Sequence, residues 1–199
     1  MTQQINANLE DRWLNAEWQT AEFKESKITS FNLLNSFLTK PPQNILDIGC
    51  GLAYESEMFQ HTYNSNLYLL DGDFESSIAN SRDRKYGPAD NMAFYTKIDS
   101  LKNNFDERKL KYNFVDANNI QLSADLKFDL VYSNVSYGYH YPLSTYLELL
   151  KAHTTKESVL IFDINSGRVA EQIKDTFNIV ESKPYPDQKK IFKFRLEFK

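Results

Sequence analysis

The fold is decided by one stretch of the chain, Ile45-Leu46-Asp47-Ile48-Gly49-Cys50-Gly51-Leu52-Ala53-Tyr54. Apolar residues flank Asp47, as in a parallel strand that is covered on both faces. Gly49 and Gly51 then allow a tight turn and a close approach of a ligand, which side chains would block. Helical spacing follows the turn, at Tyr54, Met58 and Phe59. Because ligands bind at the carboxyl ends of parallel strands, the sequence predicts a cofactor at this turn.

The residues of the turn distinguish between two classes of cofactor. A dinucleotide fingerprint needs a third small residue where this chain has Tyr54, and Asp47 would repel a pyrophosphate. The turn resembles instead the acid-x-Gly-x-Gly motif of the class I S-adenosylmethionine-dependent methyltransferases, with Ala53 at the usual third glycine. S-adenosyl-L-methionine carries an amino group and a sulfonium and no phosphate. The resemblance implies four cofactor-binding residues, Asp47, Gly49, Cys50 and Gly51, and a plain structural turn is the alternative.

A second acid ends the next predicted strand, Asn66–Asp71. Asp71 follows Asp47 at close to the roughly 20-residue spacing at which an acid reaches ribose hydroxyls in nucleoside-binding α/β units. A carboxylate there can accept both hydroxyl protons. Asp73 competes for this role because Gly72 leaves the local register open, and the spacing favours Asp71.

A third acid ends the strand predicted at Tyr112–Ala117. In the methyltransferase family the matching acid commonly receives the adenine amino group, so the resemblance gives this role to Asp116 and places Ala117 beside the ring. One acid at a strand end has little weight. Three in succession, after the first, second and third strands, carry the prediction of a cofactor site.

The fourth strand is predicted at Phe128–Asn134 and is followed by an aromatic cluster at 137–141. In the family this strand end faces the departing methyl group, which implies that Ser133 and Asn134 lie at the cofactor. Enzymes that methylate the amino groups of bases typically carry Asn/Asp-Pro-Pro-Tyr/Phe here. This chain has Ser133-Asn134-Val135-Ser136, so base methylation is not favoured.

A hydroxyl acceptor needs a general base with a pKa near neutrality, and histidine is the obvious candidate. His140 is the one histidine in the loop after the fourth strand, whereas His61 and His153 fall on or beside helices. A histidine held structurally in the aromatic cluster is the alternative. Asp163, which ends the fifth predicted strand at Ser158–Asp163, is the second catalytic candidate. It has too few oxygen ligands around it to predict a metal site.

The rest of the chain predicts one α/β domain over residues 1–199, a three-layer Rossmann-like sheet that is mostly parallel. Residues 1–40 form an N-terminal helical extension with two apolar stripes, which either packs on the sheet or carries Trp13 or Trp18 over the pocket as a lid. A helix is expected from Met92 to about Lys102. The last run, Ile191–Phe198, alternates and forms an antiparallel hairpin with the preceding strand, its Lys and Arg on the solvated face. The methyltransferase resemblance covers roughly 43–199.

Composition limits the partners. A net charge of −4 argues against nucleic acid and anionic membranes, and no apolar run approaches the roughly 20 residues of a membrane helix. The single cysteine and the polar first residues suit a reducing, cytoplasmic location. We therefore expect a transferase that uses S-adenosyl-L-methionine to O-methylate a small hydroxylated acceptor. The aromatic loop at 137–141, together with the region around Tyr86 to Tyr95, also resembles sugar O-methyltransferases, so a sugar or glycan intermediate is the expected acceptor. A protein or nucleic-acid methyltransferase and a non-catalytic cofactor-binding module are the alternatives.

Overall fold

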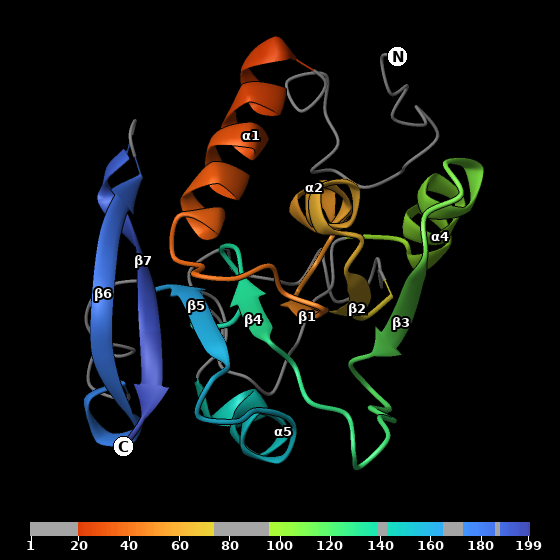
Figure 1. Cartoon of the computed structure of the whole chain (residues 1–199). Helices are drawn as coiled ribbons and strands as arrows, with labels where there is room; N and C mark the ends of the chain where they lie inside the picture. Colours follow the sequence, from red (N-terminus) through yellow and green to blue (C-terminus); the bar gives the residue numbers. More distant parts are fainter. Residues whose placement is uncertain (1–19, 74–95, 139–142, 165–172, 186–187) are drawn as a thin grey trace, which may run out of the picture.

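The structure is a computed structural model that describes residues 20–73, 96–138, 143–164, 173–185 and 188–199. In this part of the chain, seven strands form one sheet in the order β3-β2-β1-β4-β5-β7-β6 (Figure 1). The strands are β1 (Asn44–Ile48), β2 (Asn66–Asp71), β3 (Tyr112–Asp116), β4 (Leu130–Ser133), β5 (Val159–Asp163), β6 (Phe177–Tyr185) and β7 (Gln188–Phe198).

The first five strands run parallel, and β7 is antiparallel to both of its neighbours. The predicted parallel sheet with a final antiparallel hairpin is therefore confirmed. Strand β1 pairs with β2 on one side and with β4 on the other, so the strand order reverses between β1 and β4. This reversal creates a topological switch point at the carboxyl ends of β1 and β4, where open α/β sheets bind their ligands.

Helices cover both faces of the sheet, which gives the predicted three layers (Figure 1). On one face lie α1 (Ala21–Asn35), α2 (Tyr54–Tyr63) and α4 (Ile98–Glu107), and on the other lie the 3-10 turn η2 (Leu143–Tyr146) and α5 (Leu147–His153). Side chains alternate along each strand. Ile45 of β1 therefore lies in the apolar cluster on the face covered by α1, α2 and α4, and Leu46 and Ile48 lie in the cluster on the face covered by η2 and α5. By the same alternation Asp47 faces the layer of α1 and α2.

The N-terminal extension is described only from residue 20. One helix, α1, contains residues from both predicted stripes, with Thr20 accepting the backbone N–H of Phe23 as its N-cap. Leu34 is fully buried, and the ring of Phe31 packs edge-on against Phe59 of α2 with centroids 4.9 Å apart. This helix therefore packs on the domain, while Trp13 and Trp18 lie outside the described residues.

The helix expected from Met92 to about Lys102 is matched, within the described residues, by α4. Residues 74–95 lie outside the described part, and α4 begins at Ile98 and runs to Glu107. The carboxylate of Asp73 accepts the backbone N–H of Ile98 at 3.0 Å, which satisfies one of the donors at the start of this helix. The sequence prediction missed this start because the capping residue lies far away in the chain.

Candidate functional site

The glycine turn after β1 is held in a backbone conformation that requires its small residues. Gly49 has a φ of +69° and donates its N–H to the carbonyl of Leu70 at 2.7 Å. A Cβ on Gly49 would lie 2.0 Å from Oγ of Ser136, in the loop after β4. Ala53, at the position of the motif's third glycine, keeps the left-handed conformation with a φ of 53° and starts α2. The turn therefore keeps the glycine-type backbone although one glycine is replaced.

Asp71 lies directly beside this turn. One of its carboxylate oxygens accepts the N–H of Gly51 at 2.7 Å, and the other accepts the N–H of Gly72 at 2.8 Å. Its residue surface is 8% exposed, which leaves the carboxylate at the edge of the core. Asp73, the competitor for the same role, is used instead at the start of α4. Asp71 therefore contacts the glycine turn and Asp73 contacts the start of α4, and the ribose role of Asp71 stays a prediction.

The third acid continues the same edge of the sheet. Asp116 pairs with Asp71 in the register of β2 and β3, and Ala117 donates its N–H to the carbonyl of Asp71 at 2.9 Å. A carboxylate oxygen of Asp116 accepts the N–H of Asn118 at 2.9 Å, and the residue is only half-buried. Three adjacent parallel strands thus carry an acid as their last or penultimate residue, at the edge of the sheet where the glycine turn lies, as the sequence predicts.

Asp47 is the most buried of these three acids. It is 3% exposed, and its Oδ2 accepts hydrogen bonds from Ser56 at 2.9 Å and from the Tyr132 hydroxyl at 2.7 Å. Burial raises the pKa of Asp47 to about 7, opposed by the Tyr132 hydrogen bond and reinforced by the nearby charge of Glu55. This carboxyl can therefore change its charge near neutrality in response to a cation.

Cys50 occupies the turn between the two glycines. Its sulfur lies 4.0 Å from a carboxylate oxygen of Asp71. Burial, followed by the charges of Asp71 and Asp47, raises the pKa of the thiol well above its ordinary value. Cys50 is therefore a neutral thiol, which suits a packing contact with a ligand rather than nucleophilic chemistry.

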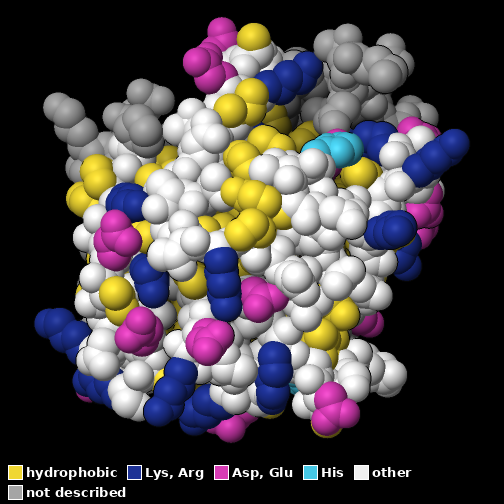
Figure 2. All heavy atoms as spheres, in the orientation of Figure 1, with side chains coloured by type: hydrophobic (Ala, Val, Ile, Leu, Met, Phe, Trp, Pro, Cys, Tyr) yellow, Lys and Arg dark blue, Asp and Glu magenta, His cyan; other side chains and the backbone are white. Residues whose placement is uncertain are grey.

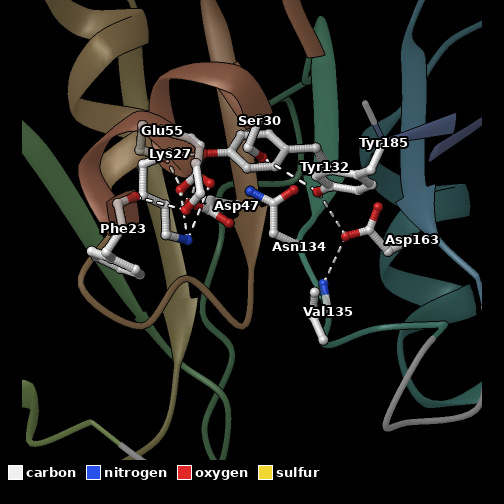
Figure 3. Close-up of polar contacts among 12 residues, drawn as sticks. Phe23, Lys27, Ser30, Asp47, Glu55, Tyr132, Asn134, Val135, Asp163 and Tyr185 are labelled. Carbon is white, nitrogen blue, oxygen red and sulfur yellow. Dashed lines mark hydrogen bonds and ion pairs between the residues drawn. The ribbon is translucent and has the colours of Figure 1, made fainter. Parts of the chain in front are cut away.

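Helix α1 contacts both the start of α2, which follows the glycine turn, and strand β6 of the C-terminal hairpin (Figure 3). Lys27 forms an ion pair with Glu55 at the start of α2, at 3.2 Å. One turn along, the hydroxyls of Ser30 and Tyr185 lie 3.4 Å apart. These contacts depend on a helix that precedes the sheet, and sequence spacing around the motif gave no sign of them.

The end of β4 is braced by Ser133. This residue is fully buried, donates to the carbonyl of Ile48 at 2.7 Å and accepts the N–H of Tyr137 at 2.8 Å. Tyr137 is also fully buried and donates its hydroxyl to the carbonyl of Leu143. One member of the predicted aromatic cluster is therefore a core residue. The predicted base, His140, and residues 139, 141 and 142 lie outside the described part of the chain.

Asp163 is fully buried, and its carboxylate accepts hydrogen bonds from three donors. Its Oδ1 pairs with Nζ of Lys193 at 3.0 Å. Its Oδ2 accepts the N–H of Val135 at 3.0 Å and the hydroxyl of Tyr185 at 3.2 Å (Figure 3). Lys193 also donates to the amide oxygen of Asn134. With three donors already bound, Asp163 is arranged to hold its neighbours; its predicted role as a base stays a prediction.

Lys193 corrects the expectation of a solvated lysine on the last strand. Its side chain is 0% exposed, because residues of the β4 loop, β5 and β6 cover it. Arg195 is partly exposed and lies 3.8 Å from Glu197, so the expectation holds better there. Strand alternation predicts the face on which a side chain lies, but not which other elements cover that face.

The remaining histidines lie on helices, as expected. His61 is part of α2 and lies 3.4 Å from Glu57, and His153 ends α5 with Nδ1 3.0 Å from the carbonyl of Leu126. Within the described ranges there is no group of three or more His, Cys, Asp and Glu residues that could hold a metal ion. No described helix is both long and apolar enough to span a bilayer. On the face in Figure 2, basic and acidic side chains are interspersed.

Comparison with known proteins supports the fold. No protein-family model and no curated protein matches the sequence. The structure is similar to that of a protein from Pyrococcus horikoshii (TM-score 0.63, 13% identity, covering 90% of this chain and 92% of that one). It is also similar to a ribosomal protein methylase from Lactobacillus delbrueckii (0.56, 14%, 88% and 79%).

A third similar structure is the 1,6-didemethyltoxoflavin-N1-methyltransferase of Burkholderia thailandensis, solved with that compound and S-adenosylhomocysteine (TM-score 0.56, 14% identity, covering 87% of this chain and 78% of that one). The chain therefore has the class I methyltransferase fold across most of its length. At these identities the likeness shows the fold alone.

Proposed function

We propose that this protein is an S-adenosylmethionine-dependent methyltransferase that acts on a small hydroxylated acceptor. One observation carries the proposal: three adjacent strands deliver carboxylates around a glycine turn in which Gly49 leaves no room for a Cβ. The proposed cofactor-binding residues are Asp47, Gly49, Cys50, Gly51, Asp71, Asp116, Ala117, Ser133 and Asn134, with Ser133 acting through the turn that it braces and Asn134 lying where the cofactor and the acceptor meet.

The residues fit the chemical groups of this cofactor one by one. Asp71 receives the ribose hydroxyls, since its carboxylate lies against the glycine turn through the N–H of Gly51 and ends the second strand, where an acid reaches a ribose. Asp47 matches the cationic amino group, because ionisation of this buried acid is favoured by a neighbouring positive charge. Asp116, which is half-buried at the sheet edge, receives the adenine amino group. A dinucleotide would place a pyrophosphate beside Asp47, so it fits poorly.

The cofactor supplies a methyl group on a positively charged sulfur. A lone pair of the acceptor oxygen forms the new bond to carbon, the carbon–sulfur bond breaks with its electron pair left on sulfur, and the hydroxyl proton leaves to a base. The protein supplies orientation and excludes water; orientation is worth roughly 7–11 kcal/mol. His140 is the proposed base, from its place in the chain after β4.

The acceptor is proposed from charge and from the residues after β4. The net charge of −4 and the interspersed charges of Figure 2 disfavour nucleic acid. The segment Asn134–Ser136 lacks the motif associated with base methylation. A sugar or glycan intermediate is the favoured acceptor. The similar structures include enzymes named for a ribosomal protein and for a small heterocycle, so a protein acceptor is the second candidate.

Calorimetry tests the cofactor. S-adenosylmethionine and S-adenosylhomocysteine should both bind the purified protein with one site, and a nicotinamide dinucleotide should not. Absence of binding by both sulfur compounds would contradict the proposal. Conversion of S-adenosylmethionine to S-adenosylhomocysteine in the presence of candidate acceptors then distinguishes an enzyme from a silent binding module.

A further inference from the structure

The loop after β4 contains a strained residue. Val135 has a φ of +52° and is 40% exposed. A β-branched residue in this conformation is an outlier, and such strain persists only where the surroundings fix the backbone. The fixing contact here is the bond from the Val135 N–H to the buried carboxylate of Asp163 at 3.0 Å. The loop is thus held in one shape at the edge where the proposed methyl transfer takes place.

The cation of Lys193 fixes the neighbouring residue. A fully buried ammonium needs compensating partners, and Lys193 has the Asp163 carboxylate at 3.0 Å, the Asn134 amide oxygen, and the Tyr185 ring with its centroid at 5.0 Å. An ammonium only donates hydrogen bonds, so it must face the oxygen of the Asn134 amide and not its nitrogen. The amide therefore has one orientation.

This orientation leaves the Nδ2 donor of Asn134 on the side of the proposed cofactor and acceptor site. In Figure 3 the amide of Asn134 lies between Asp47 and Asp163, with its nitrogen on the Asp47 side and its oxygen on the Tyr185 side. Asn134 is half-buried, and among the described residues no hydrogen-bond partner is found for its Nδ2. Because this N–H donor is fixed and partly exposed, it can donate to water or to a ligand atom with a free lone pair.

We propose that the Asp163–Lys193 pair is a positioning device that aims Nδ2 of Asn134 at the oxygen of the methyl acceptor. This inference rests on the proposed function and specifies its acceptor: an uncharged hydroxyl is taken in preference to an ammonium. A hydroxyl oxygen has two lone pairs, so one accepts from Asn134 while the other attacks the methyl carbon and the proton leaves to a base. An ammonium has no lone pair, so its N–H donors would face the N–H donors of Asn134 and no hydrogen bond could form.

The test uses matched alcohols and amines. Benzyl alcohol and benzylamine, and glucose and glucosamine, are titrated into protein saturated with S-adenosylhomocysteine at a pH near 6.5, where primary amines are largely protonated. In the wild type each alcohol should bind at least about tenfold more tightly than its amine, which is the worth of one good hydrogen bond. No detectable binding of either alcohol would overturn the assigned acceptor class.

Asn134→Asp is the decisive variant. A carboxylate can still accept from Lys193, so this contact is kept, but the donor becomes an acceptor; circular dichroism checks that the fold tolerates a second carboxylate beside Asp163. The alcohol-to-amine preference should then shift by about tenfold or more toward the amines. If S-adenosylhomocysteine affinity falls instead while the preference stays, Asn134 serves the cofactor alone and the inference is overturned.

The positioning role is tested at Lys193. Lys193→Met alone leaves a buried carboxylate unpaired and risks unfolding, so the double variant Asp163→Asn/Lys193→Met removes both charges together. It should keep S-adenosylhomocysteine binding and lose the alcohol preference. Arg195→Met is the matched control on the same strand, and it should keep both. An unchanged preference in the double variant would overturn the positioning role, whereas a wild type that fails to bind S-adenosylhomocysteine contradicts the proposed function itself.

Discussion

The carboxylate of Asp71, at the end of β2, accepts the backbone N–H of Gly51, in the turn after the neighbouring strand β1, at 2.7 Å. The same side chain therefore shapes the glycine turn and is proposed to hold the ribose. A substitution that tests the second role must preserve the first, so an amide is a better replacement than a methyl group.

Asp71→Asn should weaken S-adenosylhomocysteine binding by about 2–3 kcal/mol. The amide oxygen can still accept from Gly51, but the amide nitrogen cannot accept from Gly72, and the charge and one acceptor for the ribose hydroxyls are lost; hydrogen bonds to charged groups are the stronger ones. Calorimetry measures the affinity, and circular dichroism checks the fold.

Asp73→Ala is the matched control for this experiment. It removes the acceptor for Ile98 at the start of α4, so the free energy of unfolding should fall by about 1 kcal/mol while cofactor affinity is kept. The opposite pattern, with affinity lost at Asp73 and kept at Asp71, would move the ribose role to Asp73.

The raised pKa of Asp47 predicts how stability depends on pH. Between its ordinary pKa of 3.8 and about 7, the folded state binds more protons at this group than the unfolded state. The contribution is therefore fully present below about pH 4 and is lost as the pH rises through about 7, with a slope approaching ~1.4 kcal/mol per pH unit. Asp47→Asn should flatten this slope in urea unfolding curves, whereas parallel curves for the two proteins would contradict the shift.

The same carboxyl should release a proton when the cofactor binds. Near pH 6 the Asp47 carboxyl is largely protonated, and a cationic amino group placed beside it favours the ionised form. The observed binding enthalpy should then vary with the ionisation enthalpy of the buffer, and Asp47→Asn should lose most of this variation. Equal buffer dependence in the two proteins would mean that Asp47 does not sense the ligand.

Two glycine substitutions separate clash from backbone strain. Gly49→Ala places a Cβ 2.0 Å from Ser136 Oγ at a φ of +69°, whereas Gly51→Ala has a φ of +55° and its nearest contact at 3.6 Å. Gly51→Ala should cost about 1–2 kcal/mol from the conformation alone, and Gly49→Ala about 1–3 kcal/mol more. Adding Ser136→Gly should recover much of that difference in thermal unfolding. Equal costs at the two glycines would show that the loop after β4 moves away freely.

His140→Ala tests the proposed base. Turnover should fall by roughly 10²–10⁴, the usual share of general acid–base catalysis, with cofactor affinity nearly unchanged. The rate of the wild type should rise with pH through a pKa near that of imidazole, and the variant should lose this inflection. A structural histidine would instead lower the melting temperature and leave activity in proportion to the folded protein.

The parts of this fold that rest on local patterns could be predicted from the sequence. The second strand, Asn66–Asp71, has the predicted bounds, because a buried apolar run between polar residues is a local signal. The acids at the ends of β1, β2 and β3 followed from the same reasoning, since parallel strands gather their carboxyl ends at one edge.

The parts that rest on register could not be predicted. Tyr132 reaches Asp47 because the two residues pair across β1 and β4, and Lys193 reaches Asp163 because they pair across β5 and β7. Neither pairing has a local sequence signal. Alternation placed Lys193 on a polar face, which is correct, but solvent is excluded from that face by elements that are distant in the chain.

The pairing of Asp163 with Lys193 also disfavours any other register between β5 and β7, the strand that forms the C-terminal hairpin with β6. A slip of β7 by one residue would turn every side chain to the opposite face, which sends the lysine into the apolar cluster around Phe162 and Leu196. It would also leave a fully buried carboxylate without its cation, at a cost of roughly 3–5 kcal/mol. The proposed acceptor side is therefore complete only when the sheet edge is correctly aligned, so a chain with a misaligned hairpin would lack the proposed acceptor site.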